Sequence, residues 1–435
     1  MTILPPARGW LFATLAGLSL TVAACSSALD TANPDEVISQ DRAAADLADG
    51  STSLTPGQVV QPSQVPGDSR QGTISALSDP AHPDLPAPLV DLADIRSGGP
   101  PPDGIAPLDA PVFEQAIEVD WLAADEAVIV VDIGDDARAY PIQVLTWHEI
   151  VNDTFGDVPV TVTYCPLCNS AIVFDRRIDG QTFDFGTSGH LINSSLVMYD
   201  RQTESLWSHF TGQAIVGELT GLQLEFLPTS TVSWDDFRAS HPEGLVLSRD
   251  TGFSRPYGQN PYAGYDNPDG DPFLFDGEVD LRLRAQTRVV AVRGEDATVA
   301  IVQDWLLDQG VAEVDLDGRA LVVLLEPGVA SALEQPEIGE GRDVGATGVF
   351  VPEGGGHELT FSPSPNGVGF MDDQTGSVWS ILGEAVEGPL RGEQLEAVEH
   401  LDTFWFAIGA FETETETETE TETETEIEIV GRPAV

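Results

Sequence analysis

Apolar and polar residues alternate along much of the chain in short stretches, the pattern of half-buried β-strands. In the stretch 158–164, apolar side chains stand at every second position: Val158, Val160, Val162 and Tyr164. A second apolar run follows over 171–174, after five residues that interrupt the pattern. These two segments predict a β-hairpin, and they place Cys165 and Cys168 at its tip.

A different period precedes this hairpin. The run 128–131 is apolar and predicts a strand. Val144, Trp147, His148 and Val151 then recur at the i, i+3, i+4 and i+7 spacing of one helix face. We therefore expect an amphipathic helix that ends near Gly156, with His148 pointing inward.

The pattern is lost towards both ends of the chain. Residues 25–90 are rich in Ser, Asp, Pro, Gln and Ala without sustained periodicity, which predicts a disordered tether. Glu and Thr alternate from residue 412 to 426. In a strand these glutamates would lie on one face and repel one another, so we expect an acidic disordered tail over 411–435.

Part of the chain occurs twice. Asp200–Ser208 reappears as Asp372–Ser380, and Trp234 matches Trp405 further along. Two copies of ordinary domain size indicate a tandem duplication rather than a solenoid. The predicted fold is a β-rich α+β protein with two tandem domains, at 95–245 and 285–410, joined by a Gly-, Pro- and Tyr-rich connection over 246–284.

The two copies differ in chemistry. Where the second copy should carry its cysteine hairpin, around Leu321–Glu326, it has no cysteine. Any reaction or binding that needs thiols therefore belongs to the first repeat, and the second is expected to be a degenerate copy that serves as scaffold or lid.

Charge limits the classes of partner. The chain has 435 residues and a formal net charge of −53, and its 19 basic residues are all arginine. Nucleic acid and anionic membrane surfaces would repel such a protein, so we expect no nucleic-acid partner. A protein partner is not indicated by any motif.

The first 25 residues have the pattern of an export signal. Arg8 precedes an apolar stretch over 10–22, and small residues lead to Cys25. The segment 22–25 resembles the bacterial lipobox, which implies removal of residues 1–24 and lipidation of Cys25. We expect an exported protein held at the outer (periplasmic or extracellular) face of the cell membrane by that lipid; the alternative is a plain secretory peptide.

Several longer motifs resemble the bacterial and archaeal family DUF3179, a domain of unknown function. They extend over residues 95–410 and comprise 97–101, 103–105, 138–141, 147–153, 163–168, 198–207 and 403–407. The resemblance implies an exported, often lipid-anchored protein, and it supplies no reaction.

The Cys165-Pro-Leu-Cys168 turn is the strongest candidate for chemistry. Two thiolates and an imidazole suit zinc or copper, and this chain lacks the second cysteine pair of a tetrathiolate site. We expect a metal site of Cys165, Cys168 and His148, with His190 and Met198 as further candidates. His209 is a weaker candidate, since the second copy has Ile381 there and an apolar packing role is favoured.

Two other functions remain open for the cysteine pair. One is a thiol–disulfide oxidoreductase, and the other is a non-catalytic interaction module with a structural disulfide, the ordinary state of paired cysteines outside the cell. Whether the protein is an enzyme is left open. Glu149 is set aside as a base, because neighbouring positions on a helix point apart.

Overall fold

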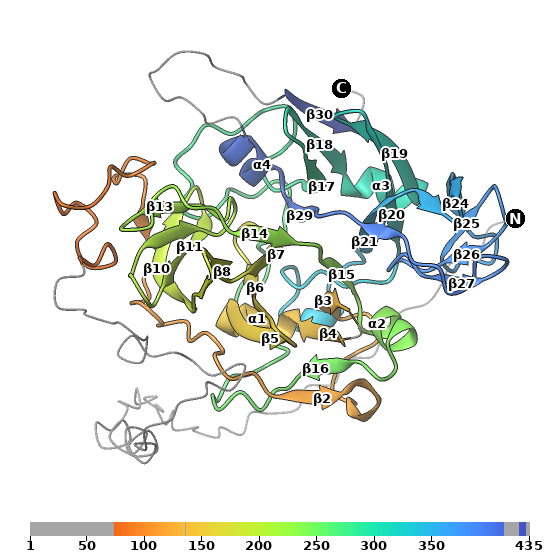
Figure 1. The fold of residues 1–435 in the computed structure, drawn as a ribbon, viewed down its shortest axis with the longest axis horizontal. Coiled ribbons are helices and arrows are strands. Elements are labelled where there is room, and N and C mark those ends of the chain that lie inside the picture. Colours follow the sequence, from red (N-terminus) through yellow and green to blue (C-terminus); the bar gives the residue numbers. More distant parts are fainter. Residues whose placement is uncertain (1–73, 135, 413–425, 432–435) are drawn as a thin grey trace, which may run out of the picture. The chain divides into compact units, whose positions relative to one another are not determined.

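The alternating stretch forms the predicted hairpin. Strand β6 (Val158–Cys165) pairs antiparallel with β7 (Ser170–Asp175), and Cys165 stands opposite Ser170. Nearly every residue of the two strands is buried, because they lie inside a four-stranded sheet. The computed structural model describes residues 74–134, 136–412 and 426–431, all within one unit that spans residues 55–435 (Figure 1).

The helix before this hairpin is shorter than expected. Helix α1 (Ile142–His148) ends at His148, and the φ of 59° at the next residue, Glu149, lies outside the helical region. Residues Ile150–Phe155 form strand β5, which pairs along its whole length with β6. The prediction that Val151 continues the helix is therefore wrong, because strand pairing outweighs the helical spacing of four apolar residues.

The first half of the chain contains three sheets, a small hairpin and two helices. The first sheet has the order β15 (Ser230–Ser233), β3 (Ala127–Ile133), β4 (Asp136–Pro141), β16 (Leu245–Leu247), β2 (Phe113–Gln115). The second has the order β14 (Glu225–Leu227), β7, β6, β5. The third has the order β1 (Arg96–Ser97), β10 (Phe185–Ile192), β11 (Ser195–Asp200), β12 (Leu206–Ser208), β13 (Ala214–Val216). The hairpin is β8 (Arg177–Ile178) and β9 (Gln181–Thr182), and the second helix is α2 (Trp234–Ser240).

The second half contains sheets of corresponding order. They are β29 (Leu401–Phe404), β17 (Arg288–Arg293), β18 (Ala297–Val302), β30 (Glu426–Val430); then β28 (Glu396–Ala397), β21 (Ala346–Val351), β20 (Arg319–Glu326), β19 (Val311–Leu316); then β24 (Phe361–Pro363), β25 (Phe370–Asp372), β26 (Val378–Trp379), β27 (Ala385–Glu387). The hairpin is β22 (Glu353–Gly354) and β23 (His357–Glu358), and the helices are α3 (Gln303–Gln309) and α4 (Trp405–Glu412). A β-rich chain with few helices is therefore confirmed.

The two halves share their core. One apolar cluster joins Val128 and Val162 of the first half to Val322 and Trp379 of the second. Strand β29 also packs against β7, and β15 packs against β21, so each half places a strand on the other. The hairpin with the cysteines is consequently surrounded by both halves.

Both predicted disordered ends contain ordered segments. In the tether predicted over 25–90, Ala76 is buried and Leu77, Leu85 and Val90 pack on the third sheet of the first half. In the predicted tail, Glu426–Val430 forms β30, parallel to β18, with Ile427 buried. Both segments are ordered because their apolar residues are buried against a sheet, which stabilises them. The signal segment, Cys25 and most of the Glu-Thr repeat lie outside the described residues.

Among the described residues, we find no helix with the length and apolar character that crossing a membrane requires.

Candidate metal centre

The cysteine turn is buried rather than exposed. Cys165 ends β6, and Cys168 lies in the turn, where Asn169 takes a left-handed conformation with a φ of 53°. The side chains of both cysteines are almost inaccessible to solvent, at 2% for Cys165 and 0% for Cys168, and both are free thiols. Solvent therefore does not reach the pair at the surface, as it would at an ordinary hairpin tip.

His209 joins the two cysteines. It follows β12, and its backbone N–H donates to the carbonyl of Leu196 over 3.1 Å. Its ring is fully buried, and neither ring nitrogen has a hydrogen-bond partner. One ligand atom from each of Cys165, Cys168 and His209 lies within 4.8 Å of the other two. A buried imidazole without a hydrogen-bond partner lowers stability, which makes His209 a candidate ligand residue.

The two thiols are electrostatically unequal. Burial raises the pKa of Cys165, and the neighbouring sulfur of Cys168 raises it further. Burial alone would also raise the pKa of Cys168, but hydrogen bonds with Cys165, Ser170 and Ser195 outweigh it and lower the pKa. The environment therefore favours the thiolate form more strongly at Cys168 than at Cys165.

Burial keeps the imidazole neutral. It lowers the pKa of His209 to about 4, an effect that the nearby Cys165 only partly offsets. A neutral ring nitrogen is the form that binds a metal ion. His209 is thus in its ligand form near neutral pH, and of the two thiols Cys168 is the one whose surroundings favour deprotonation.

Glu149 lies beside this group, with a strained backbone. It is a buried non-glycine residue at φ 59°, a conformation of the kind that clusters at functional sites. Burial raises the pKa of Glu149 to about 8, Cys165 raises it as well, and a hydrogen bond with Tyr262 opposes both. Sequence reasoning set Glu149 aside because it assumed a continuous helix, and the helix ends just before it.

His148 does not take part in the group. Its Nδ1 lies 2.7 Å from the carbonyl oxygen of Ala106, and its Nε2 lies 2.7 Å from the hydroxyl of Tyr257. A carbonyl only accepts, so Nδ1 carries the proton and Nε2 accepts from Tyr257. Both ring nitrogens of His148 are occupied, and the histidine that the structure places beside the two cysteines is His209 instead.

His190 and Met198 occupy neighbouring strands. Met198 is fully buried in β11 and belongs to the same apolar cluster as both cysteines. His190 is half-buried in β10, its Nδ1 has no hydrogen-bond partner, and burial lowers its pKa. Neither belongs to the group of three. A role as a fourth ligand stays a prediction for both.

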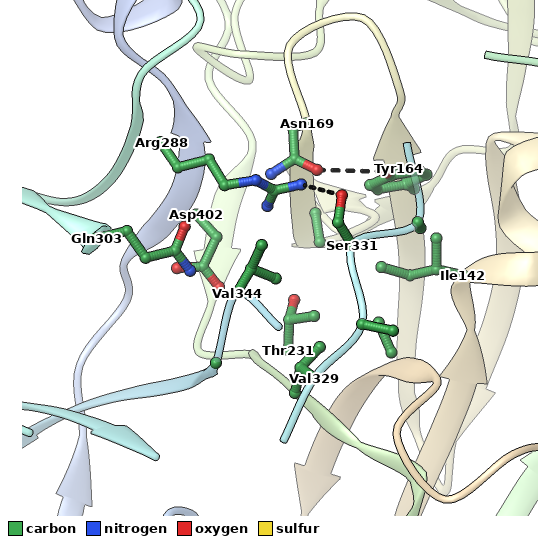
Figure 2. A pocket seen from close by; sticks show the side chains of 15 residues that line it. Ile142, Tyr164, Asn169, Thr231, Arg288, Gln303, Val329, Ser331, Val344 and Asp402 are labelled. Carbon is green, nitrogen blue, oxygen red and sulfur yellow. Dashed lines mark hydrogen bonds between the residues drawn. The ribbon is translucent and has the colours of Figure 1, made fainter. Parts of the chain in front are cut away.

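A small cavity lies beside the cysteine turn, where Asn169 lines it (Figure 2). Its volume is about 30 Å³, enough for water-sized occupants only. Tyr164 and Asn169 line it from the hairpin, and Arg288, Gln303 and Asp402 line it from the second half. Asp402 has one carboxylate oxygen that is buried without a partner. The cavity beside the turn therefore has a mixed lining, whose charged side chains, Arg288 and Asp402, both come from the second half.

A signal for His209 was present in the sequence. The repeated Trp207 and Trp379 align His209 with Ile381, the same kind of difference that singles out the cysteines. In the structure Cys165 and Glu326 likewise end corresponding strands, β6 and β20. A polar residue that replaces an apolar one at the matched position points to chemistry rather than packing.

Comparison with known proteins gives a family and no reaction. A family model described as "Protein of unknown function (DUF3179)" matches residues 102–415. Neither the curated proteins nor the solved structures provide a significant match. Because the family model extends over more than half of the sequence and contains the whole cysteine hairpin, the chain belongs to the DUF3179 family.

Proposed function

We propose that this protein binds one soft metal ion, zinc or copper, through Cys165, Cys168 and His209. The observation that carries the proposal is the fully buried imidazole of His209, which has no partner and lies within 4.8 Å of both sulfurs. Thiolate and imidazole are the ligands that zinc and Cu(I) prefer.

Charge balance favours zinc. Two thiolates and a neutral imidazole carry a net charge of −2, which a divalent ion neutralises and Cu(I) does not. Leaving a net charge in a buried site is costly. The three-ligand set leaves a fourth position for Met198, His190 or a small ligand. Burial favours a structural role for zinc over hydrolysis of a large substrate, and electron transfer applies only if the bound metal is copper.

Metal analysis tests the proposal. Protein purified without chelator should contain about one equivalent of zinc or copper, and Cys165→Ser and His209→Ile should each remove it. His357→Ala, at an exposed histidine on β23, is the matched control and should keep the metal. Unchanged metal content in the Cys165→Ser and His209→Ile variants would overturn the proposal. Met198→Leu and His190→Gln then show whether either supplies a fourth ligand.

Thiol–disulfide exchange is the second candidate. The lowered pKa of Cys168 beside the raised pKa of Cys165 favours it, because an unequal pair is what such exchange uses. The burial of both sulfurs opposes it, since a partner disulfide must reach one of them. A redox titration separates this candidate and a static structural disulfide from the metal centre: reversible oxidation above about −300 mV supports exchange.

We further infer that Cys25 carries a lipid that anchors the protein at the outer face of the cell membrane. The lipobox-like segment at 22–25 and the tether predicted after it support this. Mass spectrometry of the mature N-terminus tests it, because a lipidated Cys25 should disappear in Cys25→Ser.

The corresponding sheet orders of the two halves support a tandem duplication. We infer that the second half arose as a copy of the first and lost or never acquired the ligands.

A further inference from the structure

We propose that the second half of the chain is the positioning half of the metal centre, and that Thr403 is the residue through which it holds the Cys168 turn. This inference rests on the proposed metal site and adds a role for a half of the molecule that contains none of its ligands.

The contact is direct and buried. Thr403 is fully buried in β29, and its hydroxyl donates to the carbonyl of Cys168 over 2.8 Å. The backbone N–H of Phe404 donates to the same carbonyl over 3.1 Å. Ser170, on the far side of the turn, donates to the Thr403 hydroxyl over 2.8 Å. Three groups therefore fix the peptide that follows the Cys168 side chain.

The equivalent contact between the halves is apolar. Corresponding strands β29 and β15 place Thr403 and Val232 at the same position, each one residue before the strand's end. Likewise β7 begins with Ser170 and β21 with Ala346. The pair Ser170–Thr403 thus corresponds to Ala346–Val232. Of these two matched pairs, only the one that meets the cysteine turn carries hydroxyls.

The cavity beside the turn shows the same asymmetry (Figure 2). Three of its polar lining residues are Arg288, Gln303 and Asp402, at positions where the first half has Ala127, Ile142 and Thr231. Arg288 is held there by its ion pair with Asp266, whereas Gln303 and Asp402 are more polar than the residues at the matched places. The second half therefore faces the hairpin with a more polar surface than the first half does.

Hydrogen bonds that hold the ligand residues in place affect how tightly those residues bind a metal ion. Groups that orient a metal ligand without touching the metal typically contribute 10–100-fold in affinity. The Thr403 hydroxyl acts on the carbonyl of Cys168, so its loss should let the turn, and with it the Cys168 sulfur, move.

The test compares Thr403→Val with Thr403→Ser and with Val232→Thr. Zinc affinity is measured by competition with a chromophoric chelator, and Co(II) serves as a probe through its thiolate charge-transfer band. Thr403→Val should weaken zinc binding about 10–100-fold and change the Co(II) spectrum, whereas Thr403→Ser should restore both. Val232→Thr buries a hydroxyl away from the centre, so it should lower the melting temperature and leave metal binding unchanged.

The outcomes separate this inference from the metal site itself. Should Thr403→Val bind zinc as tightly as the unchanged protein and give the same Co(II) spectrum, the positioning role is wrong while the site stands. Should the unchanged protein take up no metal, or should Cys165→Ser bind normally, the proposed function fails first. Thr403→Ala, which also lacks the hydroxyl but adds no bulk, replaces the valine variant if that variant does not fold.

Discussion

The candidate metal site differs from the matched place in the second half at single residues. His209 and Ile381 occupy matched places after a repeated tryptophan, yet one is a buried ring without partners and the other is ordinary core. An unpartnered buried polar group lowers stability, so its presence indicates a gain elsewhere. The metal-free protein should therefore be under a strain that a single substitution relieves.

His209→Ile tests this expectation. Removing two unpartnered nitrogens should raise the free energy of unfolding of the metal-free protein by about 1–3 kcal/mol, while metal binding falls below detection. Urea unfolding in the presence of chelator measures the first effect. A variant that is less stable than the unchanged protein in chelator would contradict the expected strain, and one that still binds metal would show that His209 is a packing residue.

Glu149 should make the stability of the metal-free protein depend on pH. Its pKa in the folded protein is about 8, above the ordinary value of 4.5, because burial disfavours the carboxylate. A carboxyl group with a raised folded pKa stabilises below its unfolded pKa, and this contribution is lost as the pH rises towards 8.

Glu149→Gln should therefore unfold at a higher temperature than the unchanged metal-free protein at pH 9, and at a similar temperature at pH 4. Glutamine keeps the acceptor for Tyr262 without the charge. Parallel pH curves for the two proteins would show that Glu149 does not titrate as the structure indicates.

Among the strands and helices, the hydrophobic pattern predicted correctly those elements whose pairing partner is close in the sequence. The β6–β7 hairpin followed from strict alternation over residues 158–164 and the apolar run over 171–174, and the register put the cysteines where expected. Helix α1 was overextended because Val151 fits a helical spacing and a strand equally well. Strand β30 was missed because its partner β18 lies more than a hundred residues earlier in the chain. His148 was chosen by nearness in sequence, which says nothing of the fold around a buried ring.

The connection between the halves contributes an ionic element that composition did not predict. Asp266 is fully buried and accepts from Arg288 over 2.9 Å, from Arg342 over 2.9 Å and from Ser331 over 2.5 Å. Burial alone would raise the pKa of Asp266, but Arg288 and the other donors outweigh it and lower the pKa to about 2. The connection is thereby tied to the second half.

Asp266→Asn should lower the free energy of unfolding at pH 7 by about 3–5 kcal/mol, because it leaves Arg288 buried without its countercharge. The ionised Asp266 carboxylate stabilises the fold above pH about 4, and this stabilisation is lost as the pH falls towards 2. The stability of the variant should therefore depend less on pH over this acidic range. Asp269→Asn is the control, since its partner Arg284 is exposed and the pair contributes little. Equal losses in the two variants would contradict the argument.

At the scale of the whole molecule, charge dominates. A net charge of −53 makes the folded chain repel itself, and this repulsion weakens as salt shortens the Debye length from about 30 Å at 0.01 M to about 8 Å at 0.15 M. The melting temperature should rise steeply over this range of NaCl. Sucrose at equal osmolality is the control, and a salt response no larger than that of sucrose would show that the charges are already compensated.

The centre itself is tested most directly by X-ray absorption at the edge of the metal that co-purifies. For zinc bound by Cys165, Cys168 and His209, we expect two sulfur neighbours at about 2.3 Å and one imidazole nitrogen at about 2.0 Å. A first shell of oxygen and nitrogen alone, or protein without any bound metal, would contradict it.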